Sequence, residues 1–161
     1  MTRKPKAEII AAGPEHVPLL AEMLFEFEAY LHSLDRRHKR HSFRQIERGL
    51  RKAFAGPAPL SKALIIAQGG APAGYVLFNL GFNTTHHAPE LYVHDFYLRE
   101  KARGSGLGKV LMDALKKTAR QLGCGTMALT VWNLNPKALG FYLAQGGEPV
   151  DEDIILEWKL R

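Results

Sequence analysis

The chain has 161 residues, 46% of them hydrophobic and 24% charged, a balance typical of one globular domain with a packed core. Its longest aliphatic run, 63–67, is far shorter than the ~20 residues of a membrane span. The single cysteine, Cys124, excludes an internal disulfide and a cysteine-based zinc cluster. No apolar stretch of signal-peptide length follows the basic N-terminus. These features predict a soluble, cytoplasmic protein with a single domain over 1–161, in which 1–7 form a flexible basic tail.

The net charge of +6 is unevenly distributed along the chain. Residues 35–52 and 99–120 are strongly basic, whereas 148–157 are acidic. The cations of the first cluster are Arg36, Arg37, Lys39, Arg40, Arg44, Arg48, Arg51 and Lys52. Basic clusters favour an anionic ligand, either a phosphorylated cofactor or a nucleic acid. The alternative is a solvated surface without a ligand, and composition leaves both open.

Hydrophobic periodicity predicts both strands and helices along the chain. Ser42 is the expected N-cap of the second helix, and Asn135 with Pro136 is the expected start of the last one. In chain order we expect a strand at 8–12, a helix opened by 13–14 with apolar positions from 17 to 31, a helix at 42–55, strands at 62–68, 73–80 and 91–98, a helix at 108–122, a strand at 126–132, a short helix from 135 to about 146, and a last strand at 154–160.

The centre of this order is a strand, a helix and a second strand. Strand 91–98, helix 108–122 and strand 126–132 predict one right-handed βαβ unit with a parallel pair, inside an otherwise meandering sheet. The fold class is therefore mixed α/β.

A glycine-rich segment lies between the first strand of this unit and its helix. Its residues are Arg103, Gly104, Ser105, Gly106, Leu107, Gly108 and Lys109. Glycines let the backbone approach a ligand closely, and the N–H groups of the first helical turn favour an anion. The spacing fits neither a P-loop, which needs Ser or Thr after Gly-Lys, nor the dinucleotide fingerprint Gly-x-Gly-x-x-Gly. The segment predicts a phosphate-binding loop of another kind, or else a tight turn without a ligand.

Two motifs of the chain resemble signatures of the GNAT superfamily of N-acetyltransferases. Residues 103–108 match Arg-x-x-Gly-x-Gly, and 135–142 match Asn-x-x-Ala-x-x-Phe-Tyr. The predicted element order matches the family fold over about 8–160. The pattern is most similar to diamine (spermidine/spermine-like) acetyltransferases, in which a Glu-Asp pair stands at the positions of His94 and Asp95. The resemblance implies a central mixed sheet, splayed between its fourth and fifth strands and flanked by helices.

The resemblance also implies acetyl-CoA as co-substrate. The backbone amides of 103–109 would bind the CoA pyrophosphate, and the edge of strand 91–98 would bind the pantetheine arm through the backbone of Phe96 and Leu98. Tyr97 would also belong to the cofactor-binding residues. The Leu98 N–H would polarise the thioester carbonyl. Asn135 and Lys137 would also contact the cofactor, and Tyr142 would face the sulfur. No metal is implied, and a homodimer is usual in such proteins.

The reaction implied is direct attack of a neutral primary amine on acetyl-CoA. An alkylamine titrates near ~10.4, so the site must help the amine to lose a proton. His94, whose ordinary pKa is ~6.5, is the expected base, and Asp95 completes the catalytic set. Tyr142 is the expected general acid for the leaving thiolate, with a core tyrosine as its alternative reading. Strand alternation would place Tyr92, His94, Phe96 and Leu98 on one face and Asp95 on the other.

The expected acceptor is a small-molecule amine: a polyamine or diamine, an amino acid or an aminoglycoside, with a protein N-terminus or lysine as a further possibility. Two other functions remain as alternatives, an acyl-CoA sensor without turnover and a nucleic-acid-binding module using the basic segment 36–52. Nucleic acid is the less favoured partner because no recognised binding motif accompanies the cations. No membrane partner is expected. No metal site is expected at His86 and His87, which lie in a polar loop.

Overall fold

The computed structural model describes residues 6–150 and 155–160. The chain divides into two compact units, Met1–Thr130 and Val131–Arg161. The first unit contains a five-stranded sheet with three α-helices, and the described part of the second contains one helix. The expected tail at 1–7 lies largely outside the described residues, and Ala7 is already the first residue of a strand.

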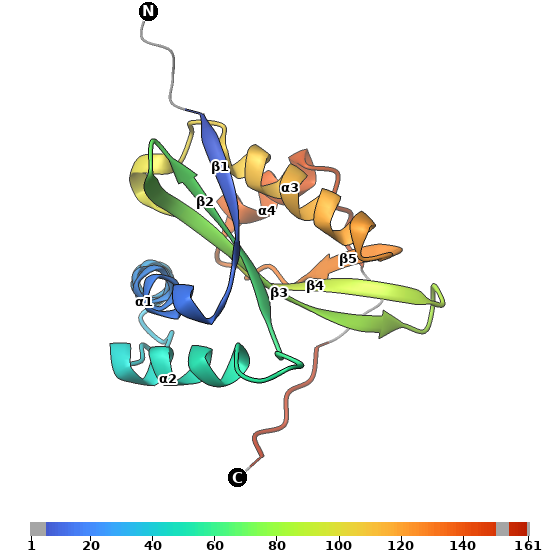
Figure 1. The fold of residues 1–161 in the computed structure, drawn as a ribbon, viewed down its shortest axis with the longest axis horizontal. Helices are drawn as coiled ribbons and strands as arrows, with labels where there is room; N and C mark the ends of the chain where they lie inside the picture. Colours follow the sequence, from blue (N-terminus) through green and yellow to red (C-terminus); the bar gives the residue numbers. More distant parts are fainter. Residues whose placement is uncertain (1–5, 151–154, 161) are drawn as a thin grey trace, which may run out of the picture. The chain divides into compact units, whose positions relative to one another are not determined.

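The sheet of the first unit has the strand order β1-β2-β3-β4-β5 (Figure 1). Its first three pairings are antiparallel and the last, between β4 and β5, is parallel. The predicted mixed α/β class and the parallel βαβ pair are therefore confirmed. The strands are β1 (Ala7–Ala12), β2 (Lys62–Gln68), β3 (Ala71–Asn83), β4 (Ala88–Leu98) and β5 (Thr126–Leu129).

Every predicted helix is present, with small shifts at the ends. The first begins as a 3₁₀ turn, η1, before α1, and a second 3₁₀ turn, η2, precedes α3. Ser42 caps α2 as expected: its hydroxyl accepts from the Gln45 N–H at 3.4 Å, and the Gln45 side chain accepts from the Ser42 N–H at 2.9 Å. The bounds are η1 (Pro14–His16), α1 (Val17–Leu34), α2 (Phe43–Ala53), η2 (Glu100–Ala102), α3 (Leu107–Gln121) and α4 (Pro136–Ala144).

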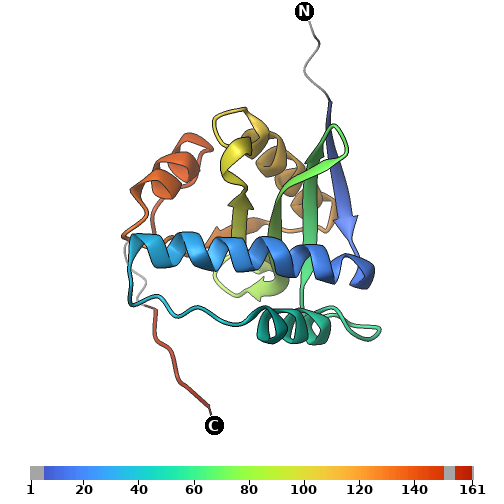
Figure 2. The same cartoon turned by 90° about the vertical axis from the view of Figure 1, so that its left-hand side faces the viewer.

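Helices cover both faces of the sheet, with α1 and α2 on one face and α3 on the other (Figure 2). We call these the α1 face and the α3 face. Because side chains alternate along a strand, each central strand contributes to two cores. On the α1 face the core contains Val17, Leu20, Ala21, Met23, Ile46, Leu50, Phe54, Ala63, Ile65, Tyr75 and Tyr97. On the α3 face it contains Leu64, Ile66, Val76, Phe78, Leu91, Val93, Leu107, Leu111, Met112, Leu115 and Ala119.

A β-bulge interrupts the regular alternation of β4. Leu77 of β3 pairs with Asp95 and the next residue, Phe78, pairs with Val93, so His94 is an extra residue in the ladder. The predicted grouping of Tyr92, His94, Phe96 and Leu98 on one face is therefore wrong. Tyr92 lies on the α1 face, whereas Phe96 and Leu98 lie on the α3 face, because the extra residue reverses the alternation.

The end of the chain also differs from the prediction. The strand predicted at 126–132 ends at Leu129. Ile154 lies outside the described residues, and 155–160 form no strand. Four apolar side chains of this segment are 69–93% exposed, namely Ile155, Leu156, Trp158 and Leu160. Alternating hydrophobicity predicts a strand, but a strand forms only where a neighbouring strand completes the ladder, and no pairing is found for these described residues.

Candidate active site

The backbone of β4 extends beyond its parallel neighbour. Pairing with β5 runs from Glu90 to Val93, and β4 continues to Leu98. The Arg99 N–H donates to the Ala73 carbonyl at 2.9 Å, which makes this a hydrogen-bonded pair of the antiparallel ladder. Since hydrogen-bonded and non-hydrogen-bonded pairs alternate, the N–H groups of Phe96 and Leu98 point away from β3, toward the edge that β5 leaves uncovered. An extended ligand could add to this edge as a strand does.

Tyr97 does not belong to that edge. By the same alternation its backbone faces β3, opposite Tyr75. Its side chain is buried on the α1 face, where its ring lies 5.3 Å from that of Phe27, and its hydroxyl donates to Glu26 at 3.2 Å. Burial and the neighbouring Glu26 charge raise the pKa of Tyr97 to about 12, so the phenol stays neutral. Of the three residues of β4 predicted to bind the cofactor, the structure therefore brings Phe96 and Leu98 to the edge, and Tyr97 lies away from it.

The glycine-rich segment forms the turn that opens α3. Gly104 and Gly106 have φ angles of +71° and +91°, in a region that residues other than glycine rarely adopt. The helix hydrogen bonds begin with the Val110 N–H donating to the Gly106 carbonyl at 3.3 Å, and no side chain caps Gly106. The preceding N–H groups therefore have no acceptor within the helix. A Cβ placed on either glycine would meet nothing within 4 Å, so an anion has room to approach.

The polar side chains of this segment are engaged within the protein. The Arg103 guanidinium lies 4.4 Å from the centre of the Tyr30 ring and donates from Nε to the Leu98 carbonyl at 3.0 Å. The Ser105 hydroxyl donates to the Ala102 carbonyl at 2.6 Å, and the Lys109 ammonium pairs with Asp113 at 2.7 Å. Anion binding at this turn thus rests on backbone groups. The turn therefore fits the pyrophosphate of CoA, which its backbone N–H groups would bind.

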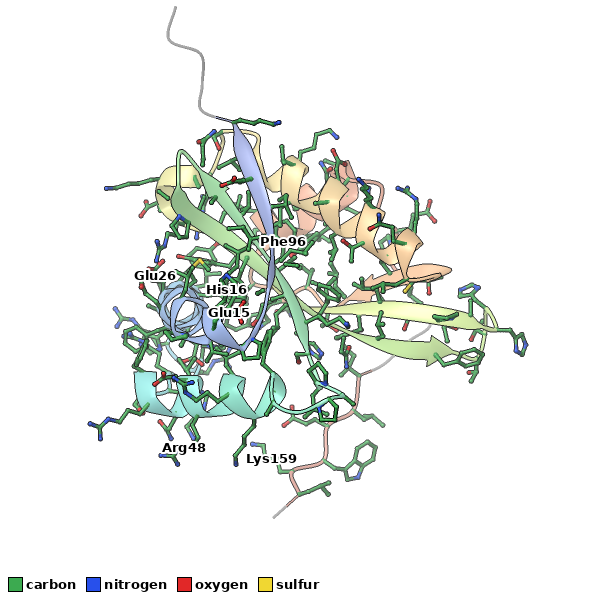
Figure 3. The ribbon with its side chains drawn as sticks, viewed as in Figure 1. Glu15, His16, Glu26, Arg48, Phe96 and Lys159 are labelled. Atoms are coloured by element: carbon green, nitrogen blue, oxygen red, sulfur yellow. The ribbon has the colours of Figure 1, made fainter. Side chains whose placement is uncertain are left out.

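An ionic network fixes the end of β4 against α1. The Arg99 guanidinium donates to Glu22, to Glu26 at 2.9 Å, and to the Pro72 carbonyl at 3.2 Å. Glu26 extends from α1 (Figure 3) and also accepts from Tyr97. Bidentate contacts of this kind orient both partners. The network therefore fixes the position of the end of β4, and of the turn that follows it, along the axis of α1.

Asp95 lies on the α1 face, in the part of β4 that β5 leaves open, and it interacts electrostatically with Glu28 of α1. Asp95 accepts a hydrogen bond from the Tyr75 hydroxyl at 3.3 Å. Burial raises the pKa of Asp95 to about 6, the negative charge of Glu28 adds to the rise, and the Tyr75 hydrogen bond opposes it. Burial and the Asp95 charge raise the pKa of Tyr75 well above its ordinary value, so Tyr75 is a neutral donor. At pH 7 and above Asp95 carries a negative charge in a poorly hydrated place, which favours a cation.

His94 projects from the bulge and is exposed. Partial burial lowers the pKa of His94 below its ordinary value, so the imidazole is neutral at pH 7 and can accept a proton. The edge of the Tyr92 ring meets the imidazole, with the ring centres 5.1 Å apart, and the Tyr92 hydroxyl shares a 2.8 Å hydrogen bond with Thr130. His94 and Asp95 are thus adjacent in sequence but differ in exposure and in the direction of their pKa shifts.

The other predicted site residues lie in the second unit, on α4 and at its start. Asn135 caps this helix by accepting from the Ala138 N–H at 3.2 Å. Lys137 is exposed. Tyr142 is half-buried, and its ring meets the Phe141 ring with the centres 5.4 Å apart. Their contacts with a cofactor stay predictions.

Glu28 and Tyr75 are members of the site that the sequence reasoning missed. A signal for Glu28 was present: it follows Val17, Ala21 and Leu24 at helical spacing, so it continues the apolar stripe of α1. A charged residue on a buried helix face needs a partner or a function. Tyr75 gave no such signal, because a tyrosine in a buried strand is ordinary.

The chain belongs to the acetyltransferase (GNAT) family, whose family model matches residues 21–146. The match contains the glycine-rich turn, the bulged strand and α4. The family uses acetyl-CoA as co-substrate, in keeping with the fit of the turn to a pyrophosphate.

Curated relatives are similar over part of their length. L-ornithine N5-acetyltransferase of Arabidopsis thaliana is 33% identical over 88 residues, 55% of this chain and 36% of that protein. Thialysine N-epsilon-acetyltransferase of Bos taurus is 28% identical over 85 residues, 53% of this chain and 49% of the relative. The match therefore spans between about a third and a half of the length of these relatives. The Mus musculus thialysine N-epsilon-acetyltransferase is 26% identical over 120 residues, 70% of each protein.

Solved structures share the fold at low sequence identity. A possible acetyltransferase from Clostridium difficile 630 has a TM-score of 0.81 and 13% identity, with 96% of this chain and 99% of that chain covered. An integron cassette protein from the mobile metagenome of V. cholerae has a TM-score of 0.80 and 21% identity, with 95% and 92% covered. These likenesses agree with the sheet order and the flanking helices described above.

Proposed function

We propose that this protein transfers the acetyl group of acetyl-CoA to a primary amine of a small cationic molecule. The observation that carries the proposal is the place of Asp95, which lies on the α1 face in the stretch of β4 that β5 leaves open and interacts electrostatically with Glu28. A cationic acceptor held by these groups would lie beside the strand edge at which the thioester is expected. The proposal extends family membership to a substrate class.

The acceptor class is supported by charge and by the relatives. An alkylammonium ion binds well where carboxylates are poorly hydrated. Ornithine and thialysine, named for the relatives, are both amino acids with a second, side-chain amino group. We therefore place a diamine or a diamino acid first among the acceptors. One of its amines would be acetylated while the other remains a cation.

The expected chemistry is a single displacement. The amine nitrogen forms a bond to the acetyl carbon as the carbon–sulfur bond breaks, and CoA leaves as a thiolate. His94 takes the proton lost by the amine, directly or through water, because its lowered pKa keeps it neutral at pH 7. The Leu98 N–H polarises the carbonyl, and Tyr142 gives a proton to the thiolate. Asp95 and Glu28 bind and orient the acceptor.

The first experiment measures thiol release from acetyl-CoA with a panel of diamines, diamino acids, monoamines and peptide amines. The wild type is compared with Tyr142→Phe and Asp95→Asn. We expect turnover with diamines or diamino acids, a lower kcat in Tyr142→Phe, and a raised acceptor KM in Asp95→Asn. Turnover only with peptide amines would refute the acceptor class. Acetyl-CoA binding without turnover on any amine would favour the sensor.

Cytoplasmic location and a homodimer stay predictions. No helix within the described ranges is long and apolar enough to cross a membrane. In the same part of the chain, no three side chains of His, Cys, Asp or Glu gather as a metal site.

A further inference from the structure

The segment between α1 and α2 is fastened to α1 by two side chains one helical turn apart. The His32 ring nitrogen Nδ1 lies 2.9 Å from the His38 carbonyl, and the Glu28 carboxylate contacts His41. Residues four apart share a helix face, so both contacts pull the segment along the same side of α1. The Glu28 side chain on α1 is therefore held by a residue of the segment between α1 and α2.

His41 contacts both oxygens of the Glu28 carboxylate. Its backbone N–H donates to Oε2 at 2.7 Å, and its ring Nδ1 lies 2.8 Å from Oε1. A carboxylate only accepts, so Nδ1 carries the hydrogen in this contact. The Glu28 side chain is 12% exposed and that of His41 is 41% exposed. Two donors on a nearly buried carboxylate leave it little rotational freedom, and each oxygen keeps a lone pair for another donor.

The backbone of His41 is itself fixed by its neighbour. Ser42 is the N-cap of α2 and exchanges hydrogen bonds with Gln45, including one from the Ser42 N–H at 2.9 Å. The first turn of α2 thus sets the position of the His41 N–H. A rigid chain of contacts runs from the start of α2 through His41 to Glu28.

We propose that His41 is a positioning residue, which holds the Glu28 carboxylate in place for the second, cationic amino group of the acceptor. This inference rests on the proposed function, because Glu28 matters to turnover only if it binds the acceptor. His41 is one residue before the cap of α2, so this helix takes part in acceptor recognition. The acetyl donor is bound elsewhere, by the edge of β4 and the turn before α3.

The test compares His41→Ala with His41→Asn in the full chain. The asparagine amide can place a donor near the position of Nδ1, whereas alanine keeps only the backbone N–H. Hydrogen bonds to charged groups support an effect of roughly tenfold. We expect His41→Ala to raise the KM for a diamine roughly tenfold, with kcat and the acetyl-CoA KM changed less than about twofold. In His41→Asn the KM for the diamine should return most of the way to the wild-type value.

A monoamine of equal length gives the specific readout, because it lacks the second cation. Its KM should be nearly unchanged in His41→Ala. His86→Ala, in the loop between β3 and β4, is the matched histidine control. An equal rise for diamine and monoamine, or no recovery in His41→Asn, would overturn the positioning role. Calorimetric binding of the diamine in the presence of CoA gives the same comparison without turnover, and an affinity unchanged by His41→Ala would also overturn it.

Glu28→Gln separates this inference from the proposed function. If Glu28→Gln raises the diamine KM and His41→Ala does not, the acceptor site stands and the role of His41 falls. If Glu28→Gln leaves the diamine KM unchanged, Glu28 does not bind the acceptor and the role of His41 falls, whereas the proposed function falls only if Asp95→Asn also leaves the acceptor KM unchanged.

Discussion

The carboxyl group of Asp95 is held in a place that disfavours its charged form. Its pKa is about 6 in the folded protein and near 3.8 in an exposed carboxyl. Between these values the folded state binds more protons than the unfolded state, so the free energy of unfolding falls as pH rises through this window. The loss is complete slightly above pH 6. It amounts to about 3 kcal/mol, since each pKa unit corresponds to ~1.4 kcal/mol.

Asp95→Asn should remove this dependence. The amide oxygen can still accept from Tyr75 but carries no charge at any pH. Relative to wild type, we expect the free energy of unfolding of the variant to rise by about 1–3 kcal/mol when the pH is raised from 4.5 to 7.5. Denaturant unfolding at both pH values measures the difference. Asp113→Asn, at an exposed carboxyl of α3, is the control and should show no comparable change. A stability difference independent of pH would contradict the burial of an Asp95 charge.

A second prediction at this scale concerns His94 as base. His94→Ala should lower kcat roughly a hundredfold at pH 7, within the range of general base catalysis. The loss should shrink toward pH 9, because a growing share of the acceptor amine is then neutral without help. The measurement is the pH–rate profile with a saturating acceptor, beside His86→Ala. A variant whose profile has the shape and height of wild type would exclude His94 as base.

At the scale of elements, the contact between α1 and β4 depends on Arg99. Arg99→Ala would leave Glu22 and Glu26, one turn apart on α1, without the cation that they share, and would remove a donor from the Pro72 carbonyl. We expect a loss of about 1–2 kcal/mol in the free energy of unfolding, as for charge-assisted hydrogen bonds that are partly screened. Denaturant unfolding measures it. The control is Arg37→Ala, which removes an ion pair of an exposed arginine that is only two residues from its partner Asp35. Equal effects in both variants would show that the Arg99 network adds nothing.

The elements themselves follow from local sequence, and several features of the site do not. Periodicity predicted β2 over its exact span, and the serine before α2 predicted its cap. The sequence pattern did not predict the bulge, because Val93, His94 and Asp95 are compatible with either face of a strand covered on both sides. The Glu28–Asp95 pair joins residues far apart in the chain, which periodicity cannot relate. The alternation at 155–160 predicted a strand without specifying any partner for it.

At the scale of the whole molecule, the two ligand classes favoured by the basic charge can be told apart. Acetyl-CoA at a hundred times its Kd should raise the free energy of unfolding by about 2.7 kcal/mol and shift Tm upward. A DNA duplex should give no shift at physiological salt. The basic residues of α2 are exposed, Arg48 points away from the sheet (Figure 3), and Arg51 pairs with Glu47. A DNA-induced shift that fades with added salt would instead support a nucleic-acid function.

The expected homodimer is testable at the same scale. Sedimentation equilibrium over a range of concentrations should give twice the mass of the chain. A constant single-chain mass at the highest concentration would contradict the dimer. The result bears on kinetics too, since a dimer that dissociates on dilution would show concentration-dependent specific activity.

The bulge in β4 also has a consequence for variation in chain length. Val93 and Asp95 sit opposite consecutive residues of β3, as direct neighbours of a regular ladder would. A chain shortened by His94 alone would therefore keep Val93 in one core and Asp95 over the other, with no side chain reversed. In a regular central strand, the deletion of one residue would instead move every side chain on one side of the deletion to the opposite face. At this point a single-codon deletion could remove the proposed base and spare the scaffold, so relatives with and without the extra residue could share a fold while differing in chemistry.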